Sequence, residues 1–239
     1  MDATGHCGLR CLAGRCLIPY ATLERPLGLL PLCRRRPRSP DLGNCLGFFR
    51  LPQGSALNEL RKHRRTILKG YIQVYTGKGK GKTTAAFGLA LRAAGAGLKV
   101  YFAQFVKGMK YSECHAVEKY LSESITLKQY GMGYFVEKEP NEEDRKVASE
   151  GLRGIKEIMC SKKYDLIVLD EANIAVYYKL FSVEDLLDFI DAKPESIELI
   201  ITGRHADPKI VERADLVTEM KEIKHYYHSG VEARMGIEK

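Results

Sequence analysis

A short strand, a glycine-rich loop and a helix follow one another near residue 76, and this succession constrains the fold more than any other feature of the chain. Residues 71–75 are rich in β-branched and aromatic side chains, which favours a strand. Alanine and leucine then predict a helix over 85–94. The loop between them reads Thr76-Gly77-Lys78-Gly79-Lys80-Gly81-Lys82-Thr83-Thr84. Glycines let such a loop curl until its N–H groups face phosphate oxygens, so this context predicts a P-loop.

Individual residues of this loop have expected roles. Lys82 should reach a phosphate, and the hydroxyl of Thr83 should ligate Mg²⁺. We expect the whole loop to hold ATP, that is, Thr76, Gly77, Lys78, Gly79, Lys80, Gly81, Lys82, Thr83 and Thr84. The usual motif has glycine where Thr76 stands. A dinucleotide-binding GxGxxG loop fits less well, because Lys82 occupies the place of its third glycine, and a turn that binds nothing is the remaining alternative.

Strands and helices continue to alternate along the rest of the chain. Further strands are predicted over 99–105, 125–130, 165–170, 197–202 and 216–220. Further helices are predicted over 113–121, 141–161, 183–190 and 207–213, with Asn141 and Ser182 as N-caps. Such alternation implies an α/β fold with a doubly wound, mostly parallel sheet and helices on both faces. With a P-loop after the first strand, we expect the P-loop NTPase-like, RecA-type architecture.

Ligands of open α/β sheets bind beyond the carboxyl ends of the strands, and two further ends carry suitable side chains. Asp170 and Glu171 follow an apolar strand in a Walker B arrangement, whose carboxylates can hold Mg²⁺ directly or through water. A carboxylate that only caps the next turn is the alternative. Arg204 follows the strand that ends at Thr202 and can bind phosphate through its guanidinium group, although a surface ion pair would need the same residue type.

The first 70 residues differ from the rest in composition. They hold 13 Lys/Arg against 4 Asp/Glu, a net charge of +9, whereas residues 71–239 have a net charge of −1. Five of the seven cysteines and six of the nine prolines precede residue 53. We therefore expect a disordered basic extension or a misassigned start at 1–56, a short helical lead-in at 57–69 and the P-loop domain at 70–239.

Three functional alternatives exist for the extension. It has the charge of a nucleic-acid-binding arm and some features of a targeting peptide, and Cys7, Cys11 and Cys16 offer metal ligands without the paired CxxC spacing of a zinc site. The near-neutral domain at 70–239 argues against nucleic acid as its partner. Apolar runs are only a few residues long, far below the roughly 20 residues that span a bilayer, so we expect no membrane segment.

Five ordered motifs, from about residue 70 to the end, resemble those of the P-loop ATP:corrinoid (cob(I)alamin) adenosyltransferases. The loop at 76–88 resembles theirs, including the threonine in place of the first glycine. The other motifs are Gln104-Phe105-Val106-Lys107-Gly108, Val168-Leu169-Asp170-Glu171, Ile201-Thr202-Gly203-Arg204 with Ala214-Asp215-Leu216-Val217-Thr218-Glu219, and a C-terminal signature that includes Lys224-His225, Gly230-Val231, Ala233 and Met235-Gly236-Ile237.

The resemblance implies a transferase that moves the 5′-deoxyadenosyl group of ATP to the Co(I) of a reduced corrinoid and releases triphosphate, in adenosylcobalamin synthesis or salvage. It implies ATP, Mg²⁺ and a corrinoid, either cobalamin or a precursor, as ligands. It also implies a flavoprotein reductase as partner, a homodimer and a cytoplasmic location. The residues expected to be catalytic are Lys82, Thr83, Glu171 and Arg204. A generic P-loop ATPase or nucleotide kinase and a nucleotide-gated binding module are the alternatives.

The same family presses aromatic residues against the lower face of the corrin, after a Gly-x-Gly that follows the third strand. Here Gly131 and Gly133 keep the glycines and Tyr134 the first aromatic, but Val136 stands where we expect tryptophan, which the chain lacks altogether. Tyr134 and Phe135 are therefore the candidates for contact with the corrinoid. An apolar wall that displaces the lower ligand of cobalt makes Co(II) easier to reduce. Ordinary loop packing of these aromatics is the alternative.

Overall fold

The computed structural model describes residues 69–131 and 140–239, all of which belong to one compact unit, Arg50–Lys239. The extension expected at 1–56 lies outside the described residues, and so does the lead-in at 57–69 except for its last residue. Tyr134 and Phe135 also lie outside them. Within the described ranges, no helix is both long enough and apolar enough to cross a membrane.

Six strands of the described residues form one sheet in the order β3-β2-β4-β5-β1-β6, and each neighbouring pair is parallel. The strands are β1 (Ile72–Thr76), β2 (Val100–Phe105), β3 (Ile125–Tyr130), β4 (Leu166–Asp170), β5 (Glu198–Thr202) and β6 (Leu216–Glu219). Each predicted strand is present, with its ends displaced by no more than one residue. All residues of β2 and β4 are buried, as expected for parallel strands that are covered on both faces.

The helices also follow the predictions, with two additions. They are α2 (Lys82–Gly95), α3 (Ser112–Ala116) with its π-helical continuation η1 (Val117–Leu121), α4 (Glu142–Cys160), α5 (Ala172–Tyr177), α6 (Val183–Asp191), α7 (Pro208–Arg213) and the 3₁₀ turn η2 (Tyr226–Ser229). Asn141 and Ser182 cap α4 and α6 through reciprocal capping boxes, as predicted. Neither α5 nor η2 was predicted. Helix α5 begins without a side-chain cap, whereas α7, of the same length, begins at the Asp207 cap followed by Pro208, and η2 is a single turn of four residues.

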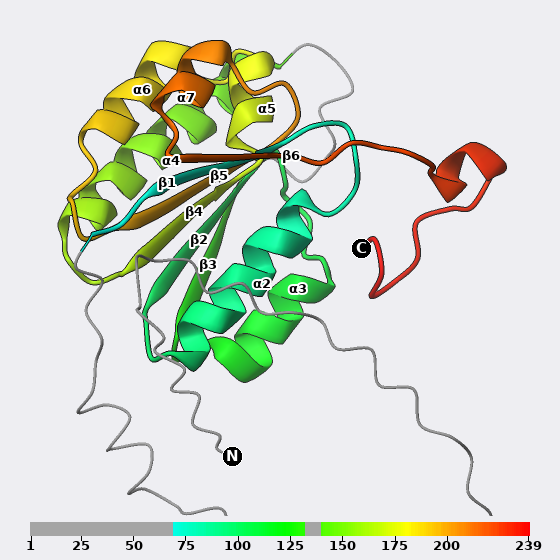
Figure 1. The fold of residues 1–239 in the computed structure, drawn as a ribbon, viewed down its shortest axis with the longest axis horizontal. Coiled ribbons are helices and arrows are strands. Elements are labelled where there is room, and N and C mark those ends of the chain that lie inside the picture. The colour runs from blue at the N-terminus through cyan, green and yellow to red at the C-terminus, as the bar shows by residue number, and fades with distance from the viewer. Residues whose placement is uncertain (1–68, 132–139) are drawn as a thin grey trace, which may run out of the picture. The chain divides into compact units, whose positions relative to one another are not determined.

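Helices cover both faces of the sheet, which confirms the doubly wound α/β prediction. Helices α2 and α3 lie on one face, and α4, α6 and α7 lie on the other (Figure 1). Alternate residues of one strand enter different cores: Ile200 of β5 packs with α2, whereas Leu199 and Ile201 pack with α4 and α6. This alternation follows from the two-residue period of a strand.

The strand register brings the chemically important strand ends to one edge of the sheet. Tyr75 of β1 pairs with Thr202 of β5, and Gln104 of β2 pairs with Asp170 of β4. The P-loop begins one residue after that β1 pairing, so it lies beside the ends of β4 and β5. This carboxyl edge is where open parallel sheets bind ligands.

Candidate active site

The P-loop takes its shape from glycine conformations and from support by the chain after β6. Gly77 has a φ of +94° and Gly81 a φ of +116°, both in the left-handed region. A Cβ atom on Gly77 would lie 2.5 Å from the carbonyl oxygen of Met220. The N–H of Gly79 donates to that same oxygen at 2.6 Å. The loop therefore packs backbone to backbone, which larger residues at these positions would prevent.

Lys82 begins α2 and points back into the curl of the loop. Its ammonium group donates to the carbonyl oxygens of Gly77 at 2.9 Å and Gly79 at 2.8 Å, and the residue is 7% exposed. Burial lowers the pKa of Lys82, although the charge of Glu171 acts in the opposite direction. The loop thus holds a cation at its centre, where a phosphate group would lie.

Asp170, at the end of β4, connects four donors from different elements. Its Oδ1 accepts from the hydroxyls of Thr83 at 2.9 Å and Thr202 at 2.7 Å. Its Oδ2 accepts from the ammonium group of Lys107 at 2.9 Å and the amide of Gln104 at 3.3 Å. Asp170 is fully buried, so this network compensates for burial of its charge. Both carboxylate oxygens accept hydrogen bonds, and the bond from Thr83 to Oδ1 fixes the direction of the Thr83 hydroxyl.

Glu171 differs from Asp170 in that its side chain lines the cavity. Its φ of +60° is a left-handed conformation that a non-glycine residue seldom adopts, and its N–H donates to the hydroxyl of Thr202 at 3.0 Å. This turn directs the two adjacent carboxylates to different places. Burial, followed by the negative charge of Asp170, raises the pKa of Glu171. Backbone strain of this kind concentrates at functional sites.

Lys107 is a site residue to which the sequence analysis gave no role. Its ammonium group lies 2.9 Å from Asp170 and 3.8 Å from Glu113. Burial acts to lower the pKa of Lys107, but the charge and hydrogen bond of Asp170, together with the charges of Glu113 and Glu171, outweigh it and the pKa is raised. Val106 has a φ of +61°, a rare conformation for a β-branched residue, and so marks a sharp turn directly before Lys107. A lysine two residues after the end of a buried strand was the available signal in the sequence.

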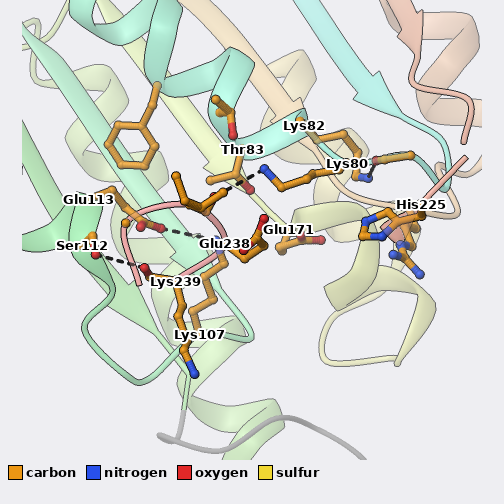
Figure 2. Close-up of a pocket in the computed structure, with 17 residues that line it drawn as sticks. Lys80, Lys82, Thr83, Lys107, Ser112, Glu113, Glu171, His225, Glu238 and Lys239 are labelled. Carbon is orange, nitrogen blue, oxygen red and sulfur yellow. Dashed lines mark hydrogen bonds and ion pairs between the residues drawn. The ribbon is translucent and has the colours of Figure 1, made fainter. Parts of the chain in front are cut away.

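These groups surround a cavity of about 520 Å³, a size typical of small-molecule sites. Figure 2 shows the labelled side chains gathered around it from the P-loop and the start of α2, the β2–α3 connection, the start of α3, the end of β4 and the C-terminal segment. Its lining consists of Gly79, Lys80, Gly81, Lys82, Thr83, Thr84, Phe87, Lys107, Ser112, Glu113, Glu171, Arg204, His225, Gly236, Ile237, Glu238 and Lys239.

Most predicted site residues meet at this cavity. Lys80, Lys82, Thr83, Glu171 and Arg204 line it together, and Asp170 lies next to it through its bond to Thr83. Thr76, Gly77 and Lys78 are not among the lining residues, and the side chain of Lys78 is exposed. Residues 236–239 were not predicted to lie in the site, because the sequence signature around Gly236 does not fix its position in space.

Comparison with known proteins agrees with this geometry. Residues 68–238 match the family described as ATP:corrinoid adenosyltransferase BtuR/CobO/CobP. The chain belongs to this family. A corrinoid adenosyltransferase from a Sinorhizobium species is 35% identical over 192 residues, which cover 80% of this chain and 90% of that protein. Corrinoid adenosyltransferases from Pseudomonas aeruginosa and Escherichia coli K12 are each 34% identical, over 71% of this chain and 84% and 86% of theirs.

Within this adenosyltransferase, charge is distributed unevenly around the cavity. The P-loop and the end of β5 contribute the cations of Lys80, Lys82 and Arg204. The acids of the lining are Glu113, Glu171 and Glu238, with Lys107 between the carboxylates of Glu113 and Asp170. A cavity that combines a cationic cradle with oxygen ligands is suited to a metal-bound polyphosphate.

Proposed function

We propose that this chain transfers the 5′-deoxyadenosyl group of ATP to the Co(I) of a reduced corrinoid. The cobalt electron pair attacks the ribose C5′, a Co–C bond forms, the C5′–O bond breaks, and triphosphate leaves with the bonding electrons. The supporting observation is the convergence of Lys80, Lys82 and Arg204 on one cavity that is also lined by Thr83, whose hydroxyl donates to Asp170. A leaving group with the full triphosphate charge needs such preorganised cations.

Each of the residues has a proposed task in this reaction. Lys82 and the loop N–H groups bind phosphate oxygens at the helix N-terminus, where the partial positive charge also favours anions. Arg204 is an exposed residue of the cavity lining, and its guanidinium group binds phosphate groups of the triphosphate that Lys82 does not contact. Lys107 balances the carboxylates of Glu113 in α3 and Asp170 at the end of β4. Because cobalt supplies the electron pair, no side-chain nucleophile is required.

We propose Mg²⁺ as the bound cation, on the chemistry of the donor set. The hydroxyl of Thr83 and the carboxylate of Glu171 are hard oxygen ligands that line the cavity, whereas Asp170 acts by orienting Thr83. Among the described residues, no group of three or more His, Cys, Asp or Glu side chains could hold a metal by itself. Mg²⁺ usually completes its coordination shell with water and substrate phosphates, so few protein ligands are needed. A bound Mg²⁺ would neutralise charge on the triphosphate.

The corrinoid side of the site rests on the family resemblance. Tyr134 and Phe135, outside the described residues, stay the proposed contacts with the lower face of the corrin. If Tyr134 has this role, Tyr134→Ala should reduce turnover from cob(II)alamin plus reductant far more than ATP affinity, whereas an equal loss of both would exclude it. A flavoprotein reductase, a homodimer and a cytoplasmic location stay predictions of the same origin, and the resemblance allows either cobalamin or a precursor as acceptor.

The deciding experiment is anaerobic incubation of the full chain with ATP, Mg²⁺ and chemically generated cob(I)alamin. We expect light-sensitive adenosylcobalamin by absorbance, with an equal amount of triphosphate and no orthophosphate. Orthophosphate without a Co–C bond would instead indicate a generic P-loop ATPase. Repeating the assay with a cobalamin precursor identifies the preferred acceptor from the ratio of kcat/KM values.

A further inference from the structure

The C-terminal segment 225–239, which we call the C-terminal arm, returns to the nucleotide cavity after leaving the sheet. It follows β6 as the red segment that projects from the sheet and then turns back (Figure 1). Four consecutive residues, Gly236, Ile237, Glu238 and Lys239, line the cavity together with the P-loop. The arm is therefore a wall of the site, and the sequence signature at 235–237 falls on this wall.

Two elements of the domain hold the arm in this position. The hydroxyl of Ser112, at the start of α3, donates to the carbonyl oxygen of Lys239 at 3.0 Å and lies 3.5 Å from the sulfur of Met235. The ammonium group of Lys80 in the P-loop donates to the carbonyl oxygen of Ile237 at 3.3 Å. The arm thus bridges the cavity from the loop to α3, as the dashed contact between Ser112 and Lys239 in Figure 2 marks on one side.

The arm is also braced internally. The guanidinium group of Arg234 donates to the carboxylate of Glu238 at 3.1 and 3.3 Å, and the backbone N–H of Arg234 donates to it at 2.9 Å. The hydroxyl of Tyr226 donates to the same carboxylate, and Arg234 lies 5.1 Å from the centre of the Tyr226 ring. The Glu238 side chain is only 14% exposed. These contacts fix the backbone at 236–239, whose carbonyl oxygens meet Ser112 and Lys80.

The two sides of the cavity differ in chemistry. The P-loop side offers cations and N–H donors, whereas the opposite side offers the carboxylate of Glu113 and carbonyl oxygens of the arm backbone. Lys239 also lines the cavity, and so does Lys107, whose charge is paired with Asp170. Oxygen acceptors repel a triphosphate but accept hydrogen bonds from ribose hydroxyls. Phe87 and Ile237 add apolar surface to the lining, and Ile237 is 57% exposed. A molecule with an anionic end and a neutral, hydroxyl-bearing end fits this division.

We propose that the C-terminal arm forms the wall that receives the adenosine half of ATP, and that the Arg234–Glu238 pair positions this wall. The inference rests on the proposed function only in taking ATP as the ligand. It assigns Arg234 and Glu238 as positioning residues, since they act through the backbone at 236–239. Inorganic triphosphate lacks the adenosine half, so its binding should not depend on the arm.

Calorimetric binding of ATP and of inorganic triphosphate, each with Mg²⁺, tests the proposal in the full chain. We expect Arg234→Ala and Glu238→Gln to raise the Kd for ATP about five- to tenfold and to leave the Kd for triphosphate within twofold of wild type. Arg213→Ala, which removes an exposed Arg–Asp pair between α7 and α6, is the matched control and should change neither. Unchanged ATP affinity in the arm variants, or equal weakening of both ligands, would overturn the proposal.

Two further measurements separate this result from other failures. Lys82→Ala should weaken both ligands; if it weakens neither, the P-loop assignment fails, and the arm result is judged separately. Hydrogen exchange on the wild-type protein needs no variant, so it remains decisive if an arm variant unfolds. ATP should slow exchange of the amides at 236–239 and triphosphate should not, whereas equal protection by both ligands or by neither contradicts the proposal.

Discussion

The hydroxyl of Thr83 donates to Oδ1 of Asp170 at 2.9 Å, which joins the P-loop to the end of β4 across 87 residues of sequence. Thr202 donates to the same oxygen at 2.7 Å and so adds the end of β5 to the connection. The three strand ends that the sequence analysis selected therefore meet at one buried carboxylate. This arrangement fixes the direction of the Thr83 hydroxyl and leaves Glu171, rather than Asp170, at the cavity.

Replacement of Lys82 tests the phosphate cradle. Lys82→Ala removes the cation at the centre of the loop, so we expect kcat/KM for ATP to fall about 100- to 1,000-fold, the loss typical of a preorganised electrostatic group. Lys146→Ala is the control, because it removes the same charge from an exposed side chain of α4, away from the predicted site residues. Its kcat/KM should stay within about threefold of wild type. Equal losses in the two variants would indicate that only net charge matters.

Substitutions at Thr83 test the proposed hydroxyl ligand. Thr83→Ser keeps the oxygen that bonds to Asp170, whereas Thr83→Val keeps the shape and removes it. We expect the serine variant to retain most activity and the valine variant to lose about 100-fold or more in kcat. The valine variant should also require a higher Mg²⁺ concentration for half-maximal ATP binding, measured by calorimetry. A valine variant with a normal Mg²⁺ requirement would place the cation elsewhere.

Glu171 provides a prediction about pH. Because its pKa is raised in the folded protein, the folded state holds a proton that the unfolded state has lost between pH 4.5 and the raised pKa. Wild-type stability therefore falls as pH rises through this window. Residue 171 does not titrate in Glu171→Gln, so the melting temperature of this variant should exceed that of wild type at pH 8. This advantage should shrink toward pH 4.5.

The same variant should lose activity, since its amide replaces a carboxylate that lines the cavity. Glu157→Gln on the exposed side of α4 is the control, and calorimetric melting at pH 8 and 4.5 compares the three proteins. If Glu171→Gln is less stable than wild type at both pH values, the buried charge of Glu171 does not destabilise the folded protein, and the prediction is wrong.

Substitution of two glycines by alanine compares a loop position that has no room for a Cβ atom with a helix position that has room for one. Gly203 has a φ of +134°, and a Cβ atom there would lie 2.9 Å from the Cβ of Asn173, so Gly203→Ala should destabilise the protein by ~1–3 kcal/mol. Gly154 lies inside α4, and nothing is within 4 Å of its hypothetical Cβ. Gly154→Ala should therefore stabilise it by ~0.5–1 kcal/mol. Urea unfolding measures both changes, and destabilisation of similar size in both variants would contradict the local explanation.

Much of the fold was predictable because the relevant signals are local. The apolar runs at 165–170 and 197–202 give β4 and β5, and Asn141 and Ser182 mark the starts of α4 and α6 through capping chemistry that involves only neighbouring residues. Helix α5 was missed because it has no side-chain N-cap to mark its start, whereas α7, equally short, is marked by Asp207 and Pro208. The turn η2 has only four residues.

The sequence by itself determined the identity of the strand-end residues, since a P-loop and a Walker B strand are contiguous motifs whose chemistry is written in adjacent positions. Only the tertiary structure decided which side chains share a cavity. Lys107 meets Asp170 across 63 residues, and Ser112 meets Lys239 across 127. The physical reason is that a hydrogen bond depends on the distance between two atoms in space. The order of the strands and the path of the chain between them, rather than local propensity, set that distance.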